Sequence, residues 1–176
     1  MVTYIVESKT IKYNTKKRLE FVNITKDVQD FVKKSGIKKG TITIQTHHTT
    51  CGVWVNEDEK NLIGGEGTKN KIPDLKRILD RFASPEEDYG HNDIQDANNP
   101  KGKRDTHLCE PDEKGVCHEC INGHSHAQAM ILQNSITLIV ENKKPLLGTW
   151  QEIMLIELDH NRERTLTFLA QGIKEE

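Results

Sequence analysis

Residues 40–55 read GTITIQTHHTTCGVWV, and this stretch decides the fold. Up to His47, isoleucine alternates with threonine and glutamine, and this period of two predicts a strand with one apolar face. Val53-Trp54-Val55 predicts a second strand after the loop His48-Thr49-Thr50-Cys51-Gly52. The polar loop between the two strands is a place where a rigid scaffold can hold reactive side chains.

The same reasoning, extended in both directions, predicts about seven strands and three helices. The other strands are expected over residues 3–7, 18–22, 135–140, 151–158 and 164–170, and the helices over 25–36, 71–83 and 125–134. Thr25 is the expected N-cap of the first helix, and Gly36 is its expected left-handed stop. Residues 14–17 and 159–161 are expected to turn two hairpins, one near each end of the chain. Sequential hairpins favour a mixed or antiparallel sheet, so the predicted fold class is α+β.

Composition limits the classes of function. The chain has 176 residues, a formal charge of −2, 34% hydrophobic residues and 30% charged residues. We expect one domain over residues 1–176, with no basic field for nucleic acid and no apolar run of about 18 residues to span a membrane. No signal peptide is evident, so the expected location is cytoplasmic, with reduced cysteines.

The segment 105–126 reads DTHLCEPDEKGVCHECINGHSH and is rich in metal-ligating residues. Cys117 and Cys120 form a Cys-x-x-Cys pair, and His107 and Cys109 form a His-x-Cys pair upstream. One nitrogen and three sulfurs make a tetrahedral set that suits zinc, and zinc would order a loop that has no core of its own. We therefore expect a structural zinc site in an insertion at about residues 105–120.

Three other states of these cysteines stay open: a redox-active Cys-x-x-Cys, a disulfide and free thiols. A redox motif normally opens a helix after a buried strand, and no apolar strand precedes Cys117. The fourth zinc ligand, His107, has alternatives in Asp105, Glu110 and His118.

Three further histidines stand in loops that are far apart in the sequence. They are His48 after the first strand, His91 in a Tyr-Gly-His triplet, and His126 at the start of the third helix. Any one of them alone would be read as a structural residue. Three of them, with Glu57 as a carboxylate, are the components of an acid–base or metal site.

These motifs resemble those of the YjbQ-like family. HTTCGVWVNE, YGH, NGHSH, SITLIV and LLGTWQEI stand in the family's order and spacing along nearly the whole chain. The Gly-Thr-Trp-Gln block at 148–151 is fairly specific, whereas His-Thr-Thr alone is not. The resemblance implies an α+β fold, a homotrimer and secondary thiamine-phosphate synthase activity, a transferase reaction on phosphorylated metabolites.

The resemblance also implies which side chains form the site. The catalytic residues would be His48, Glu57, His91 and His126. The substrate-binding residues would be Thr49, Thr50, Gly148, Thr149 and Gln151. An arginine of the last hairpin, either Arg162 or Arg164, would complete the pattern.

Two positions depart from the family pattern. Lys143 stands where the family has glycine, so the turn before Leu146 can differ in conformation. The segment 105–120 is longer and richer in cysteine than usual, which puts a simple transfer of substrate in doubt.

Three functions fit these residues. The first is the transferase, and the second is a metal-dependent hydrolase in which His48, His91 and His126 hold a second metal. The third is a non-enzymatic trimer that binds a metal or metabolite. In each case we expect the three histidines to converge in one cleft, near residues 148–151 and at a subunit boundary.

Overall fold

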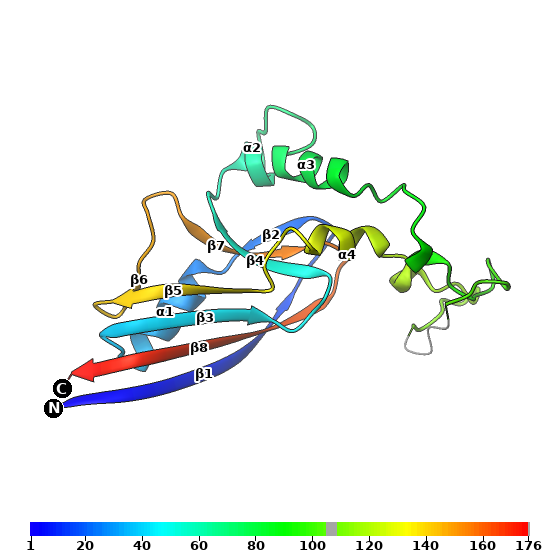
Figure 1. Ribbon diagram of the computed structural model, residues 1–176. Coiled ribbons are helices and arrows are strands. Elements are labelled where there is room, and N and C mark those ends of the chain that lie inside the picture. The colour runs from blue at the N-terminus through cyan, green and yellow to red at the C-terminus, as the bar shows by residue number, and fades with distance from the viewer. Residues whose placement is uncertain (105–108, 176) are drawn as a thin grey trace.

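Two antiparallel β-sheets and four α-helices make up the part of the chain that the structure describes, residues 1–104 and 109–175. The structure is a computed structural model, and Figure 1 shows its ribbon. All pairs of neighbouring strands in the two sheets are antiparallel. The α+β class predicted from the sequence is therefore confirmed.

The larger sheet has the strand order β1-β8-β3-β5-β6. Its strands are β1 (Val2–Asn14), β3 (Lys39–Thr46), β5 (Ser135–Glu141), β6 (Lys144–Pro145) and β8 (Glu163–Glu175). β8 pairs with β1 along its whole length on one side and with β3 on the other. The alternation predicted for β3 is present, because Ile42 and Ile44 are buried while Thr41 and Thr43 lie on the opposite face.

The smaller sheet corrects both predicted hairpins. It has the order β2-β7-β4, with β2 (Glu20–Asn23), β4 (Cys51–Asn56) and β7 (Glu152–Glu157). Strand β1 does not pair with β2, and β7 does not pair with β8. The reason is the composition of β7, in which consecutive residues from Ile153 to Ile156 are all buried. A strand that is apolar on both faces needs cover on both sides and takes a central position.

The main core lies between the two sheets and α1 (Thr25–Ser35). Val28 and Val32 of α1 meet Ile42 of β3 and Leu155 of β7 there. Their spacing along α1 gives the helix the apolar stripe of an amphipathic helix, and this stripe faces the core.

The ends of α1 follow the prediction in part. Gly36 ends the helix with φ of 76°, the left-handed conformation expected for a glycine stop. Thr25 is not the N-cap, because Ile24 occupies that position without a side-chain cap. The Thr25 hydroxyl instead accepts a hydrogen bond from the Ile153 backbone N–H at 2.7 Å, which ties α1 to β7.

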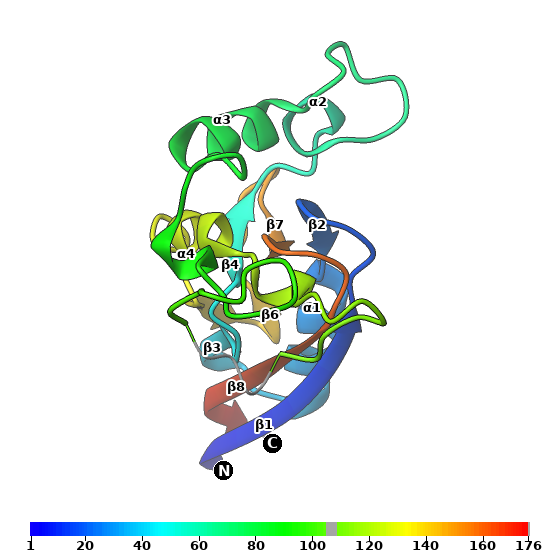
Figure 2. The ribbon, with the colours of Figure 1, turned by 90° about the vertical axis from the view of Figure 1, so that its right-hand side faces the viewer.

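The other three helices lie on the far side of the smaller sheet (Figures 1 and 2). They are α2 (Lys60–Ile63), α3 (Asp74–Phe82) and α4 (Gly123–Ala129). A second apolar cluster forms there from Leu19, Leu79, Met154, Ile156 and Leu158. No helix of the described residues is long and apolar enough to cross a membrane.

Two helices are shorter than predicted. α3 starts only after Pro73, since proline favours the first turn and the residue before it avoids the helical region. α4 ends at Ala129, because the next residues run alongside β4, where the Val53 N–H donates to the Gln133 carbonyl at 2.8 Å.

The loops contain little regular secondary structure. Between Ser84 and Asn122 the described residues contain only two short 3₁₀ turns, Gly90–Asn92 and His118–Cys120. The turn between β5 and β6 holds Asn142 and Lys143 at φ of 51° and 63°. Glycine adopts this left-handed conformation without strain and lysine does not, so the departure from the family pattern has a local cost.

A buried ion pair joins the two sheets. Arg164 of β8 is 1% exposed and Glu157 of β7 is 0% exposed. The Arg164 Nε donates to Glu157 at 2.6 Å, and its Nη2 donates to Glu157 and to the Thr50 hydroxyl. The Thr15 hydroxyl and the Asp159 N–H also donate to the Glu157 carboxylate. These contacts compensate for removing both charges from water.

We expect Arg164→Met to lower the free energy of unfolding by about 3–5 kcal/mol, because it leaves the Glu157 carboxylate buried without a counter-ion. Urea unfolding followed by circular dichroism measures the loss. The double variant Arg164→Met/Glu157→Leu should recover much of it, since no buried charge remains. A double variant as unstable as the single one would contradict this account.

Candidate functional site

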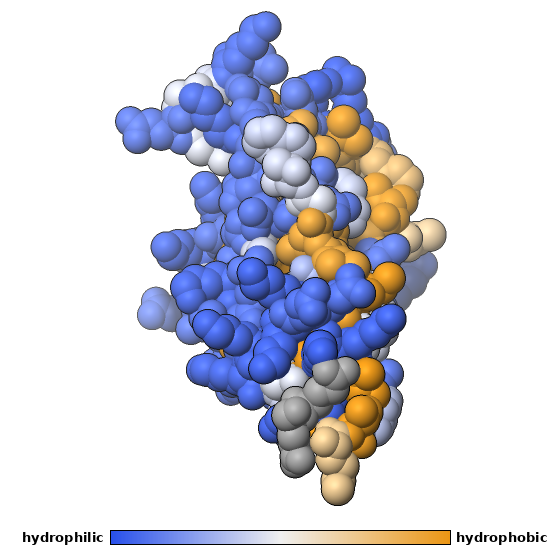
Figure 3. Space-filling view, turned by 90° about the vertical axis from the view of Figure 1, so that its left-hand side faces the viewer, coloured by the Kyte–Doolittle hydropathy of each residue, from blue (hydrophilic) through white to orange (hydrophobic). Residues whose placement is uncertain are grey.

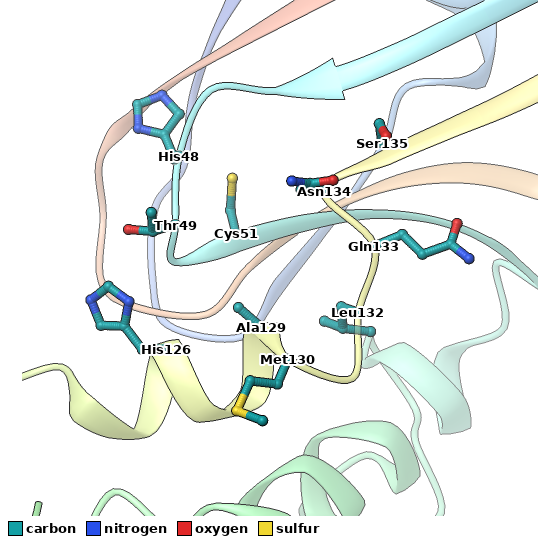
Figure 4. Close-up of a pocket in the computed structure, with 10 residues that line it drawn as sticks. All are labelled: His48, Thr49, Cys51, His126, Ala129, Met130, Leu132, Gln133, Asn134 and Ser135. Carbon is teal, nitrogen blue, oxygen red and sulfur yellow. The ribbon is translucent and has the colours of Figure 1, made fainter.

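A pocket at one end of the two sheets contains two of the predicted histidines. It lies between the β3–β4 loop and α4 and has a volume of about 520 Å³. Its lining residues are His48, Thr49, Cys51, His126, Ala129, Met130, Leu132, Gln133, Asn134 and Ser135. Figure 4 shows His48 and His126 on the same side of the pocket, with Thr49 between them.

The third histidine lies against one of these two, His126. The rings of His91 and His126 meet edge to face, with centroids 4.5 Å apart and an interplanar angle of 61°. His91 comes from the 3₁₀ turn at residues 90–92 and His126 from α4. The fold therefore brings His91 to His126, and His48 to the same pocket as His126, from segments that are far apart in the sequence.

Backbone contacts set the orientation of His48. Its Nε2 accepts a hydrogen bond from the Thr165 N–H at 2.8 Å. With Nε2 as the acceptor, a neutral ring carries its proton on Nδ1. The backbone N–H of His48 also donates to the Thr46 hydroxyl.

The two threonines beside His48 have different environments. Thr49 is exposed and lines the pocket, as a substrate-binding residue would. Thr50 was expected to share that role, but it is buried and its hydroxyl accepts from Arg164. Cys51 is buried against Thr46, and burial raises the pKa of its thiol. Cys51 is therefore a packing residue, as its position in the strand indicates.

Burial lowers the pKa of all three histidines below their ordinary value of 6.5, because the charged ring loses its water. Nearby positive groups add to the effect: Arg164 on His48 and Arg104 on His91. For His126, the interaction with the neighbouring His91 ring is the second largest cause of the lowered pKa, behind burial. The three rings are accordingly neutral at neutral pH and can accept a proton or bind a metal.

A polar network surrounds the histidines. Asn122 donates to Asp159 at 2.8 Å, and Arg162 pairs with Asp159 at 3.3 Å. The Asn122 side chain also hydrogen-bonds to His91, and this contact opposes the lowering of the His91 pKa. Within the described residues, the buried Arg162 Nε has no hydrogen-bond partner, although buried polar atoms are usually paired.

Sequence reasoning missed part of this network. Asn122 belongs to the NGHSH motif, whose histidines alone are candidate site residues by sequence. Asp159 lies in the predicted turn of a hairpin that does not form. His124, also in the motif, is 6% exposed, and its Nε2 accepts a hydrogen bond from Arg18 at 3.0 Å. Of the two candidate arginines, Arg164 lies in the ion pair and Arg162 borders the histidines.

The remaining predicted site residues lie at the other end of the molecule. Cys51, at the start of β4, borders the histidine pocket, and Asn56 ends the strand. A six-residue strand spans roughly 17–20 Å. Glu57 follows Asn56, and Gln151 precedes Glu152, which pairs with Asn56.

A tight turn holds the Gly-Thr-Trp-Gln block at that end. The side-chain oxygen of Gln151 accepts a hydrogen bond from the Gly148 N–H at 2.8 Å, and the backbone N–H of Gln151 donates to the Gly148 carbonyl. Thr149 and Trp150 are exposed at the tip, Trp150 to 71%. Figure 1 shows this loop, between β6 and β7, on the opposite side of the molecule from α4. Within one chain the block lies away from the histidines, and its expected proximity to them at a subunit boundary stays a prediction.

The cysteine segment is compact. His107 lies outside the described residues. Cys109 and Cys120 are paired as a disulfide with Cα atoms 6.3 Å apart, and the Cys117 sulfur lies 4.0 Å from the Cys109 carbonyl. His118 is directed to Asp112 instead, at 3.2 Å. Three sulfurs in one place suit zinc if the disulfide is reduced, so zinc stays a prediction.

Among residues 1–104 and 109–175, no group of three or more His, Cys, Asp or Glu side chains is placed to hold a metal ion. The use of His48, His91 and His126 as a second metal site thus also stays a prediction.

We expect the folded protein to lose stability as the pH falls below about 6.5. The folded-state pKa of His126 and its neighbours is lowered, so the unfolded chain binds more protons in this range and unfolding is favoured. Urea unfolding at about pH 7.5 and about pH 5.5 measures the difference. The difference between the free energies of unfolding at the two pH values should be smaller in His126→Gln. It should be unchanged in His47→Gln, because the ring of His47 is exposed. An unchanged difference in His126→Gln would contradict the expectation.

Comparisons with known proteins agree with the motifs. Residues 9–173 match the family model described as UPF0047 protein YjbQ-like. The UPF0047 protein YugU of Bacillus subtilis is 30% identical over 93% of this chain and 98% of its own length. A UPF0047 protein of Methanocaldococcus jannaschii is 31% identical over 85% of this chain and 83% of its own length.

The fold agrees as well. The crystal structure of a YbjQ-like protein of unknown function from Sulfolobus solfataricus P2 superposes with a TM-score of 0.73 at 29% identity. The match covers 97% of this chain and 99% of that one. With nearly the whole chain matched in sequence and in structure, this protein belongs to the YjbQ-like UPF0047 family.

Proposed function

We propose that the histidine pocket is the active site of a transferase that acts on small phosphorylated molecules. The reaction implied by the family resemblance is secondary thiamine-phosphate synthesis. In it, a nitrogen of the thiazole phosphate forms a bond to the methylene carbon of the pyrimidine diphosphate. The carbon–oxygen bond to the diphosphate breaks, and pyrophosphate leaves.

The observation that supports an active site is the pocket that His48 and His126 line together, with the ring of His91 packed against His126. A volume of about 520 Å³ is within the usual range for small-molecule sites. Groups with shifted pKa values in a cleft are typical of catalytic sites.

Charge supports a phosphorylated substrate. Two positively charged side chains lower the pKa values of the histidines. Arg104 acts on His91 and His126, and Arg162 acts on His48. A departing pyrophosphate gains negative charge, and nearby guanidinium groups stabilise it in a site with little water. The neutral rings of His48 and His126 would donate hydrogen bonds to phosphate oxygens.

A metal-dependent hydrolase is the second candidate. The observation that favours it is the edge-to-face contact of the His91 and His126 rings, which brings two imidazoles from separate segments together. Neutral imidazole nitrogens are good zinc ligands, and a bound zinc would supply an activated water. A trimer that only binds a metal or metabolite is the remaining alternative.

The family resemblance also supports a homotrimer, which we propose for this chain. Exposed apolar side chains such as Met130, Ile139 and Trp150 provide surface for contacts between subunits.

We expect His126→Ala to abolish the release of pyrophosphate from a mixture of pyrimidine diphosphate and thiazole phosphate, because it removes a pocket-lining imidazole. An enzyme-coupled pyrophosphate assay measures the rate. His47→Ala is the matched control, since its exposed ring contacts Thr167 and not the pocket. Retained activity in His126→Ala would exclude the proposed role.

The ligand that co-purifies separates the two enzymatic candidates. Native mass spectrometry of the purified protein should find a phosphorylated metabolite bound if the transferase proposal is right. A bare metal that is lost in His126→Ala, without any phosphorylated molecule, would favour the hydrolase instead.

We also propose that Cys109, Cys117 and Cys120 hold a structural zinc ion. Protein purified under reducing conditions should contain about one zinc per chain. The double variant Cys117→Ser/Cys120→Ser should lose it, because two of the ligands are gone, whereas Cys51→Ala should keep it. Elemental analysis measures the zinc content per chain, and thiol titration measures the number of free cysteines. Two titratable thiols without metal would identify the disulfide as the resting state.

A further inference from the structure

A second pocket lies between the start of β2 and residues 64–73, which join α2 to α3. Figure 2 shows α2, α3 and the loop between them above β2. The pocket has a volume of about 430 Å³ and shares no lining residue with the histidine pocket. We call it the lysine pocket, because Lys17, Lys71 and Lys76 line it.

The charge of the lysine pocket is opposite in sign to that of the whole chain. Its positively charged lining residues are the three lysines and Arg18, and its one negatively charged lining residue is Glu20. The chain as a whole has a formal charge of −2. A cavity lined by one sign of charge attracts ligands of the opposite sign. The lysine pocket therefore favours an anion.

Arg18 and Glu20 are already engaged within the protein. The guanidinium group of Arg18 donates to Asp80 and, through its Nε at 3.0 Å, to the His124 ring. The Glu20 carboxylate accepts a hydrogen bond from the Lys16 N–H at 2.5 Å. Arg18 is thus a fixed wall of the pocket, and a ligand has to be held by the lysines.

The three lysines, in contrast, are available to a ligand. Within residues 1–104 and 109–175, the ammonium groups of Lys17, Lys71 and Lys76 form no hydrogen bond or ion pair. An ammonium group is a compact charge with three donors and is a common ligand of phosphate. A phosphate ester carries about −1.5 to −2 charges at pH 7, which three such groups can neutralise.

An apolar floor distinguishes this pocket from the rest of the charged surface. Hydrophilic residues cover much of the molecule in the view of Figure 3, so exposed lysines alone identify no site. In the lysine pocket, however, the buried Leu19 and the half-buried Phe21 and Ile63 also line the cavity. These three side chains belong to the second apolar cluster. Such a lining covers the apolar part of a ligand, while a few polar groups fix its orientation.

The rim of the pocket is held in place by contacts at both ends of the loop. Gly64 has φ of 105°, and a Cβ atom at this position would lie 3.1 Å from the Pro73 ring. Glycine therefore allows the loop to close onto the residue that precedes α3. The Lys69 N–H donates to the Asn61 side chain at 2.7 Å, which ties the loop to α2. A site that is formed before binding loses little conformational freedom when a ligand enters.

From these observations we infer that the lysine pocket binds a small organic phosphate whose remaining part is apolar. The phosphate group contacts the ammonium groups of Lys17, Lys71 and Lys76, and the apolar part lies against Phe21 and Ile63. A volume of about 430 Å³ is within the usual range for such ligands. The site is separate from the histidine pocket, and the inference does not rest on the proposed function.

Titration with phenyl phosphate, which joins a phosphate group to an apolar ring, tests the inference. Amide NMR spectra locate the binding, because Gly64 and Gly65 line the lysine pocket whereas Thr49 and Ser135 line the histidine pocket. The resonances of the two glycines should shift and reach saturation. Inorganic phosphate and phenol each carry one half of this chemistry, and each should bind about tenfold more weakly or worse.

Removing two of the lysines should weaken this binding. Lys71→Gln/Lys76→Gln removes two ammonium groups, so the dissociation constant of phenyl phosphate should rise about tenfold or more. The matched control Lys34→Gln/Lys69→Gln changes the net charge equally at exposed positions outside the pocket, and it should bind like the unmodified protein. Circular dichroism of the two variants checks that both are folded.

The outcomes decide the inference separately from the proposed function. Glycine resonances that do not shift, or that shift equally in the variant without the two pocket lysines, would overturn it. Inorganic phosphate that binds as tightly as phenyl phosphate would also overturn it, as would shifts confined to the histidine pocket. His126→Ala should leave the two glycine shifts unchanged while it abolishes pyrophosphate release, so each proposal can fail without the other.

Discussion

The buried pair of Arg164 and Glu157 is the interaction on which the rest of the structure depends. It connects β8 of the larger sheet to β7 of the smaller one and fixes the β3–β4 loop through Thr50. His48 is the second residue before Thr50, so the same arginine that holds the sheets together also determines where this histidine stands. Its positive charge helps to keep the ring neutral. The stability of the fold and the pKa of His48 therefore depend on the same side chain.

Local sequence patterns identified most of the elements but not their partners. The alternation around Ile42 and the stripe of Val28 and Val32 were sufficient for β3 and α1, because those patterns depend on one buried face. Both predicted hairpins were wrong, because proximity in sequence does not decide pairing when a strand such as β7 is apolar on both faces. Its consecutive buried residues were visible in the sequence and would have indicated a central position.

The site, like the fold, could be predicted from the sequence only in part. The contact of His91 with His126, and the position of His48 in the same pocket as His126, could be anticipated from the family motifs, since residues with a common chemistry occur together in a site. The division of the predicted residues between two ends could not, because it depends on the direction in which β4 and β7 run. Asn122 and Asp159 were missed, because each looks like an ordinary loop residue until the fold places it beside an imidazole.

The position of β8 has a consequence for biosynthesis. It lies between β1 and β3 in the larger sheet, yet it is translated after every other strand of either sheet. Until β8 leaves the ribosome, β1 has no partner in this sheet and one edge of β3 stays open, each with a row of free backbone groups. Such edges can pair with other nascent chains. Polar and charged residues alternate along β1, and β3 carries threonines. These side chains would keep the unpaired strand edges hydrated, and so less prone to aggregate, until β8 pairs with them.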